Sequence, residues 1–118
     1  MTATCSTFRH AAAAMAAILA VGTAWPAAAE EPARIEVTLK GHRFEPSEIH
    51  VPAGKPTILV VTNLDDTAEE FDSSALKVEK VIAAGHNATI RLRPLGPGRF
   101  PFMGEFHPET ATGAVVSE

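Results

Sequence analysis

The 118-residue sequence predicts an all-β protein, a Greek-key β-sandwich preceded by a secretory signal peptide. Three observations support this fold class. Short segments alternate between apolar and polar residues, which is the period of half-buried strands. Clusters of Gly, Pro and Asn separate these segments. After Ala29 no segment has the pattern of a helix of useful length, and about seven short strands joined by such turns are typical of a sandwich.

The expected strands follow one another along the chain. The first covers residues 34–40, where Ile35, Val37 and Leu39 share one side. The β-branched run at residues 57–63 is bounded by turn residues and predicts a central strand. The acidic segment after it reads as a loop that runs into a short strand. Further strands are expected within residues 76–82, 88–95, 96–102 and 113–117.

Residues 1–29 predict the signal peptide. Arg9 and His10 precede an apolar run at residues 11–25, and small residues then lead to an acidic start. A retained membrane anchor is the alternative, but a spanning helix needs about 20 apolar residues. We therefore expect cleavage after Ala29 and a mature domain of residues 30–118. Its expected location is the periplasm or the exterior, with no membrane insertion of the mature domain.

Composition narrows the function classes. The chain carries a formal net charge of −4, so it has no electrostatic reason to bind nucleic acid. Its single cysteine, Cys5, lies in the leader, so the mature domain can form no disulfide. No nucleophile elbow, phosphate loop or catalytic carboxylate pair is present, and we expect no enzyme. The mature length suits one domain, expected to be a monomer or weak dimer.

Four pieces in a fixed order resemble the cupredoxin family. They are "FEPSEIHVPAG" at residues 44–54, a strand ending at Asn63, "AAG" at residues 83–85, and "PGRFPF" followed by His107 and "GAVV". Within the family, "NLDDTAEEFDSS", "LKVEKVIAAG" and "GRFPFMGEFHP" are similar to small exported proteins that accompany bacterial iron-uptake permeases. The resemblance implies a two-sheet sandwich. As partners it implies a metal ion and an inner-membrane iron permease or another periplasmic subunit.

The resemblance also implies where ligands would lie. A blue-copper site uses two imidazoles, a cysteine thiolate and a weak axial ligand. Glu69 occupies the first imidazole slot, Gly104 the thiolate slot and His107 the second imidazole slot. Without the thiolate, a blue electron-transfer centre cannot form. The predicted cofactor is a transition-metal ion, copper or iron, with manganese also possible, because carboxylates and imidazole suit these ions.

Five residues are predicted as metal ligands: Glu69 and His107 as the main pair, assisted by Glu70, Met103 and Glu105. Strict alternation turns Met103 and Glu105 outward, so Met103 would reach the ion only through a bulge at Gly104.

The other histidines of the mature chain are not expected to bind metal. His42, which precedes the first family signpost, is expected to cap the sandwich. His50 and His86 are expected on the surface.

Two functions remain open at this stage. The first is a periplasmic metal-binding accessory to iron or other transition-metal uptake, which binds, oxidises or hands over the metal. The second is a metal-free module that docks a permease or another periplasmic subunit. It would use the acidic loop and the edge from Met103 to Phe106.

Overall fold

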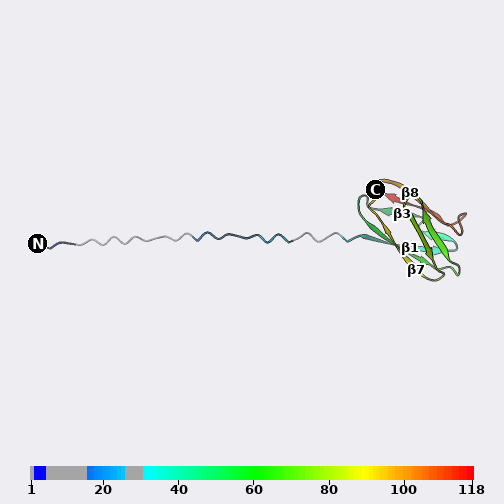
Figure 1. Ribbon diagram of the computed structural model, residues 1–118, viewed down its shortest axis with the longest axis horizontal. Helices are drawn as coiled ribbons and strands as arrows, with labels where there is room; N and C mark the ends of the chain where they lie inside the picture. The colour runs from blue at the N-terminus through cyan, green and yellow to red at the C-terminus, as the bar shows by residue number, and fades with distance from the viewer. Residues whose placement is uncertain (1, 5–15, 26–30) are drawn as a thin grey trace.

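The computed structural model describes residues 2–4, 16–25 and 31–118, and the sandwich lies in the last of these ranges (Figure 1). Within the described part of the chain, no helix is long and apolar enough to cross a membrane. The predicted cleavage after Ala29 lies outside the described residues. The strands are β1 (Ala33–Lys40), β2 (Arg43–Glu45), β3 (Glu48–Val51), β4 (Thr57–Asn63), β5 (Glu69–Ser73), β6 (Val78–Ile82), β7 (Asn87–Leu92), β8 (Gly98–Gly104) and β9 (Thr112–Ser117).

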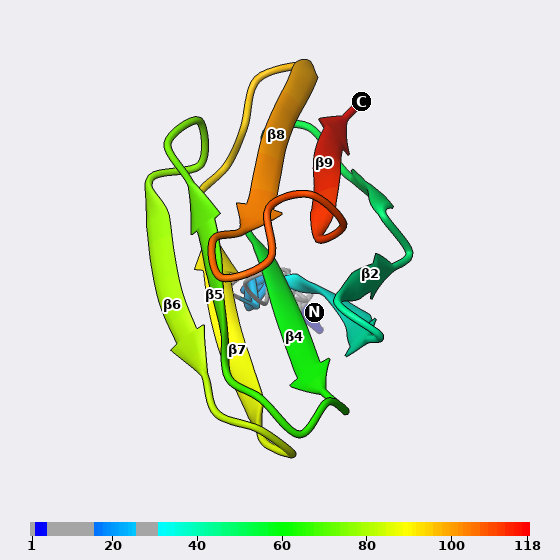
Figure 2. The same cartoon turned by 90° about the vertical axis from the view of Figure 1, so that its right-hand side faces the viewer.

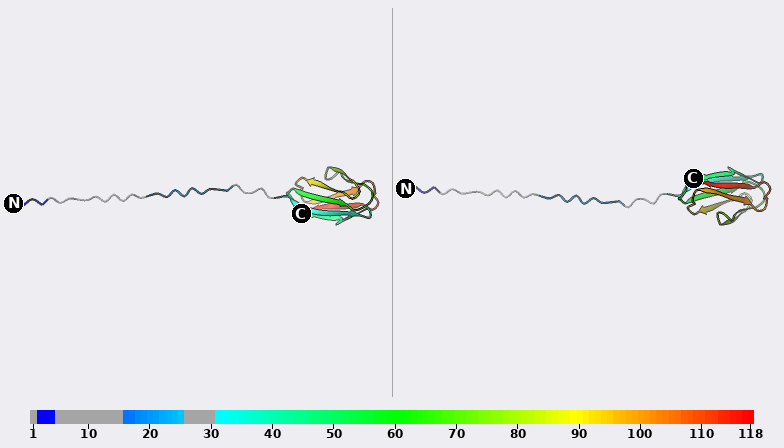
Figure 3. Two further views of the ribbon diagram at one scale, coloured as in Figure 1. Left: turned by 90° about the horizontal axis from the view of Figure 1, so that it is seen from below. Right: turned by 90° about the horizontal axis from the view of Figure 1, so that it is seen from above.

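The strands form two mixed sheets that face each other (Figure 3). One has the order β2-β1-β4-β7, and the other has the order β3-β9-β8-β5-β6. β1 pairs with β4 in parallel, and β3 pairs with β9 in parallel, while the other pairs are antiparallel. The prediction of an all-β sandwich is therefore confirmed.

Alternation along the strands creates the core. In β7 the burial pattern alternates strictly, and in β4 nearly every residue is buried because the strand is central. Three phenylalanines from different strands meet between the sheets. Phe71 stacks on Phe102 with ring centroids 4.7 Å apart, and Phe44 meets both rings edge-on. Pairs of this kind add stabilisation beyond the burial of their area.

The structure contains short strands that the sequence pattern did not resolve. The segment that carries the apolar residues Phe44, Ile49 and Val51, for which no strand was expected, forms both β2 and β3. The acidic segment is a loop that runs into the short strand β5 at Glu69, as expected. Strands of three or four residues, such as β2 and β3, contain too few alternations for their period to be read.

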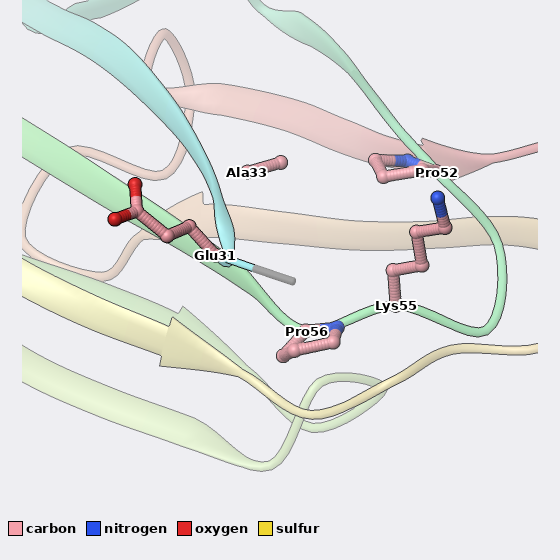
Figure 4. Close-up of a pocket in the computed structure, with 5 residues that line it drawn as sticks. All are labelled: Glu31, Ala33, Pro52, Lys55 and Pro56. Carbon is pink, nitrogen blue, oxygen red and sulfur yellow. The ribbon is translucent and has the colours of Figure 1, made fainter. Parts of the chain in front are cut away.

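Different loops form the two ends of the sandwich. At one end lie the β1–β2 turn, the β4–β5 loop and the β8–β9 loop, and Figure 2 looks onto this end. The opposite end is where β1 begins. There a small pocket is lined by Glu31, Ala33, Pro52, Lys55 and Pro56 (Figure 4).

The C-terminal residue is held by a charged contact that should depend on pH. His50 Nδ1 lies 2.7 Å from Glu118 Oε1, and His50 Nε2 lies 3.1 Å from Glu48 Oε1. The hydrogen bond with Glu118, followed by the charges of both carboxylates, raises the pKa of His50.

We expect the stabilisation by His50 to be complete below its unfolded pKa of about 6.5 and to be lost as the pH rises through the higher folded pKa. Thermal unfolding of the wild type and His50→Ala, followed across this range, tests it. The two melting temperatures should converge at high pH, and His86→Ala should show no such convergence. A constant difference between wild type and His50→Ala would contradict the assignment. The effect should be small because these side chains are exposed.

Candidate metal centre

Three side chains converge at the end of the sandwich that Figure 2 faces. His42, Glu69 and His107 each present one ligand atom, and these atoms lie within 4.8 Å of one another. Each comes from a different segment: the β1–β2 turn, the start of β5 and the β8–β9 loop. No other group of three or more potential His, Cys, Asp or Glu ligands gathers in this way among the described residues.

Glu69 is the buried member of the group. Its side chain is 1% exposed, and both carboxylate oxygens have partners. Oε1 accepts hydrogen bonds from the backbone N–H of Phe106 at 2.8 Å and of Glu70 at 3.0 Å. Oε2 lies 2.5 Å from His107 Nδ1. Burial of a carboxylate is costly unless it is paired and hydrogen-bonded. These three partners offset the cost of burying Glu69.

His107 is positioned by its own loop. Its carbonyl oxygen accepts hydrogen bonds from the backbone N–H of Thr110 and of Ala111, which closes the loop into a compact turn. Its side chain is 24% exposed, so one edge of the ring reaches solvent while Nδ1 faces Glu69. The ring packs against His42, with centroids 3.6 Å apart and an interplanar angle of 35°.

His42 owes its position to a two-residue hairpin turn. Lys40 and Arg43 are paired across the hairpin, and the residues between them, Gly41 and His42, have φ angles of 59° and 56°. Positive φ at both central positions is the type I′ geometry that matches the twist of a hairpin. His is one of the few side chains enriched in this region, so the turn can present an imidazole at its tip.

Asp65 fixes this turn from the neighbouring loop. Its carboxylate accepts hydrogen bonds from the backbone N–H of Gly41 at 2.7 Å and of His42 at 2.9 Å. These bonds, that from His42 foremost, lower the pKa of Asp65. The buried Asn63 in turn holds Asp65: the backbone N–H of Asp65 donates a hydrogen bond to Oδ1 of Asn63 at 3.0 Å. The Asn that ends β4 therefore positions His42 indirectly.

The structure brings two of the five predicted ligands together and places the other three elsewhere. Glu69 and His107 are in direct contact. Glu70 alternates to the outer face of β5, where burial, followed by the charges of Glu105, Glu79 and Asp72, raises its pKa. Met103 is 42% exposed and pairs in register with Asp72 on that outer face. Glu105 is exposed. Among the described residues, neither Glu70 nor Glu105 belongs to the cluster of potential ligands.

His42 is the member of the site that sequence reasoning missed. The expectation that it caps the sandwich without joining a site differs from the structure, which places it against His107. A signal was available: Gly41 and His42 lie between two alternating segments, as in a two-residue hairpin turn. That turn predicts an imidazole at a hairpin tip, but only the parallel pairing of β1 and β4 in the structure places His42 at the same end as Asn63.

The donor set consists of two imidazoles and one carboxylate. Such a set suits copper(II), zinc and iron(II), and two histidines with one carboxylate are the ligands of many non-haem iron(II) sites. Among the described residues the cluster contains no cysteine, and a blue-copper centre needs a cysteine thiolate, so a blue-copper spectrum is not expected from it. Fold and site together define a β-sandwich protein with a candidate mononuclear metal centre.

Comparison with known proteins identifies the family. The cupredoxin-like domain family matches residues 11–116, and the chain belongs to this family. An uncharacterized protein of Rickettsia prowazekii (strain Madrid E) is 38% identical over 82 residues, which cover 70% of this chain and 66% of the relative. The chain thus spans slightly less than two thirds of that relative.

Solved structures share the fold at low sequence identity. The metal-binding domain of the Cu(I)-exporting P-type ATPase CopA of Streptococcus pneumoniae, determined with Cu(I), is 16% identical, with a TM-score of 0.64, over 72% of this chain and 84% of that chain. Auracyanin B is 16% identical, with a TM-score of 0.62, over 76% and 92% of the two chains. A Cu(I) form of an amicyanin variant is 20% identical, with a TM-score of 0.60, over 72% and 82%. The cupredoxin sandwich predicted from the sequence is confirmed.

Proposed function

We propose that this protein is a periplasmic metal-binding protein that holds one transition-metal ion through His42, Glu69 and His107. The observation that carries the proposal is the convergence of these three side chains within 4.8 Å of one another at one end of a cupredoxin sandwich. Buried carboxylates and paired imidazoles are costly to assemble, and an ion that bridges them offsets that cost.

Copper(II) is the ion that we expect to bind most tightly. Among divalent first-row ions a given nitrogen and oxygen site prefers copper(II), and imidazole suits it well. Two solved structures of the same fold hold copper as Cu(I), which supports copper as the metal without fixing its oxidation state. Iron(II) fits the same donor set more weakly by this ordering, so a role in iron uptake would depend on which metal the compartment supplies.

The leader and the resemblance to exported relatives support the rest of the proposal. In this proposal the protein is an accessory to iron or other transition-metal uptake: it binds the ion, and oxidises it or hands it over to an inner-membrane permease. It carries out no group-transfer chemistry. The high local density of carboxylates near the centre would increase the rate of cation capture.

Calorimetric titration with copper(II) tests the proposal. Wild-type protein should bind one equivalent, and His107→Ala should weaken binding by more than about tenfold, because removal of even outer partners of a metal ligand costs about 10–100-fold. His86→Ala is the matched control, since His86 is exposed and bonds only locally to Ala84 through its ring. Equal binding by the wild type and His107→Ala would refute the site.

A second function is favoured by the outer face of β5 and β8. Glu70, Asp72, Glu79 and Glu105 lie close enough for their charges to interact, beside the exposed Met103. Such a surface would suit a basic patch on a permease or another periplasmic subunit. If neither copper(II) nor iron(II) binds, and a subunit is captured equally with and without chelator, this docking role replaces the metal-binding one.

A further inference from the structure

Gly104 leaves a space that the Glu69 carboxylate fills. Gly104 is buried and is the last residue of β8, and it pairs in register with Phe71 of the neighbouring strand β5. A Cβ added at this position would lie 2.6 Å from Cδ of Glu69, 2.9 Å from its Oε1 and 2.7 Å from Cβ of Ala111. Contacts below 3.0 Å are not tolerated by real Cβ atoms, so a neighbour would have to move.

Neither neighbour can move freely. The oxygens of Glu69 are held by two backbone N–H groups and by His107, so its carboxylate is not the loose end of a flexible side chain. Ala111 is fully buried. Its carbonyl oxygen accepts a hydrogen bond from the N–H of Gly104 at 2.6 Å, and its own N–H donates to the backbone carbonyl oxygen of His107 at 2.9 Å. Any side chain at position 104 would therefore push against the Glu69 carboxylate and so disturb the candidate metal centre.

Backbone conformation does not explain the glycine. Gly41, Gly54, Gly85 and Gly98 have positive φ angles, and Gly104 does not. A residue with a side chain could adopt the same backbone conformation, so the requirement at position 104 is for space.

We propose that Gly104 is the positioning residue that gives this site its carboxylate ligand. Because residue 104 has no side chain, the Glu69 carboxylate can lie over β8 and face His107. A side chain at position 104 and a carboxylate from position 69 exclude each other from one volume. Residue 104 thus decides whether the carboxylate at position 69 can reach the candidate metal site. This inference builds on the proposed function, but the packing that it invokes exists in the metal-free protein.

The test compares Gly104→Ala with Gly96→Ala, a glycine whose added Cβ would meet nothing within 4 Å. In the metal-free proteins, NMR of the imidazole nitrogens should show altered His107 resonances in Gly104→Ala and unchanged ones in Gly96→Ala. Copper(II) affinity should fall at least tenfold in Gly104→Ala only. Unchanged His107 resonances in Gly104→Ala would overturn the inference even if no metal binds, which separates its failure from that of the proposed function.

A second comparison covers the case in which Gly104→Ala does not fold. In a Glu69→Ala background the two contacts between a Cβ at position 104 and the Glu69 carboxylate are gone, while the 2.7 Å contact with Cβ of Ala111 remains. Gly104→Ala should therefore shift the unfolding midpoint less there than in the wild type. Equal shifts in the two backgrounds would show that Ala111 alone makes position 104 intolerant of a side chain, and would overturn the inference.

Discussion

Glu69→Ala should lower the free energy of unfolding of the metal-free protein by about 3 kcal/mol. This is the upper end of the range of about 1–3 kcal/mol for leaving buried hydrogen-bonding groups unsatisfied, chosen because Glu69 accepts from two backbone N–H groups and also contacts His107. The substitution leaves the N–H groups of Glu70 and Phe106 without their acceptor and opens a cavity above Gly104. Copper(II) binding should also fall by more than about tenfold. Urea unfolding in the presence of chelator measures the first effect, and calorimetric titration the second.

The neighbouring Glu70→Ala is the matched control. Glu70 has the same side chain one position along β5, but it lies on the outer face among other carboxylates, whose charges help to raise its pKa. Its removal should change the free energy of unfolding by no more than about 0.5 kcal/mol. Any change should be stabilising, because one of several neighbouring negative charges is removed. Copper(II) affinity should stay the same. If both variants lost binding equally, the inward and outward assignment of β5 would be wrong.

Phe71→Ala should lower the free energy of unfolding by about 3–5 kcal/mol, the usual range for truncating a buried phenylalanine. Phe71 is completely buried and stacks on Phe102 at a centroid distance of 4.7 Å, so the substitution removes an aromatic contact and creates a cavity beneath the metal end. For a domain of this size, such a loss can approach the total stability. Urea unfolding followed by circular dichroism measures it.

Phe106→Ala provides the comparison for this effect. Phe106 is 49% exposed, and its known contribution to the site is its backbone N–H, which alanine retains. We expect a change within about 0.5 kcal/mol. A loss comparable to that of Phe71→Ala would show that the β8–β9 loop is packed more tightly than its exposure indicates.

The fold could be predicted from the sequence because its main strands are periodic. The alternation of Ile35, Val37 and Leu39 continues into the structure, where the last two are fully buried. Strict alternation also predicted that Met103 faces outward, and its exposure agrees. The inward position of Glu69 came from the family resemblance. A single acidic residue at the start of a short strand has no pattern of its own.

The third member of the site depends on contacts between distant segments. His42 lies far along the chain from Asp65, and what aims it at His107 is the hydrogen bonding of Asp65 to the turn. Such contacts follow from the parallel register of β1 and β4, which local propensity does not encode. In the same way, nothing in the sequence shows that the carboxylate of Glu69 rests on Gly104.

The directions of the first and last strands have a practical consequence for attaching the protein to something else. β1 begins and β9 ends at the same pole of the molecule (Figure 1), where the backbone N–H of Ala53 donates to the carbonyl oxygen of Glu118. The three candidate ligands lie in the loops and strand start of the other pole. A fusion partner, purification tag or immobilising linker joined just before β1 or after Glu118 would therefore leave the candidate metal pole open to solution. The same arrangement would let the sandwich be inserted whole into a loop of a larger host, with its histidines presented outward.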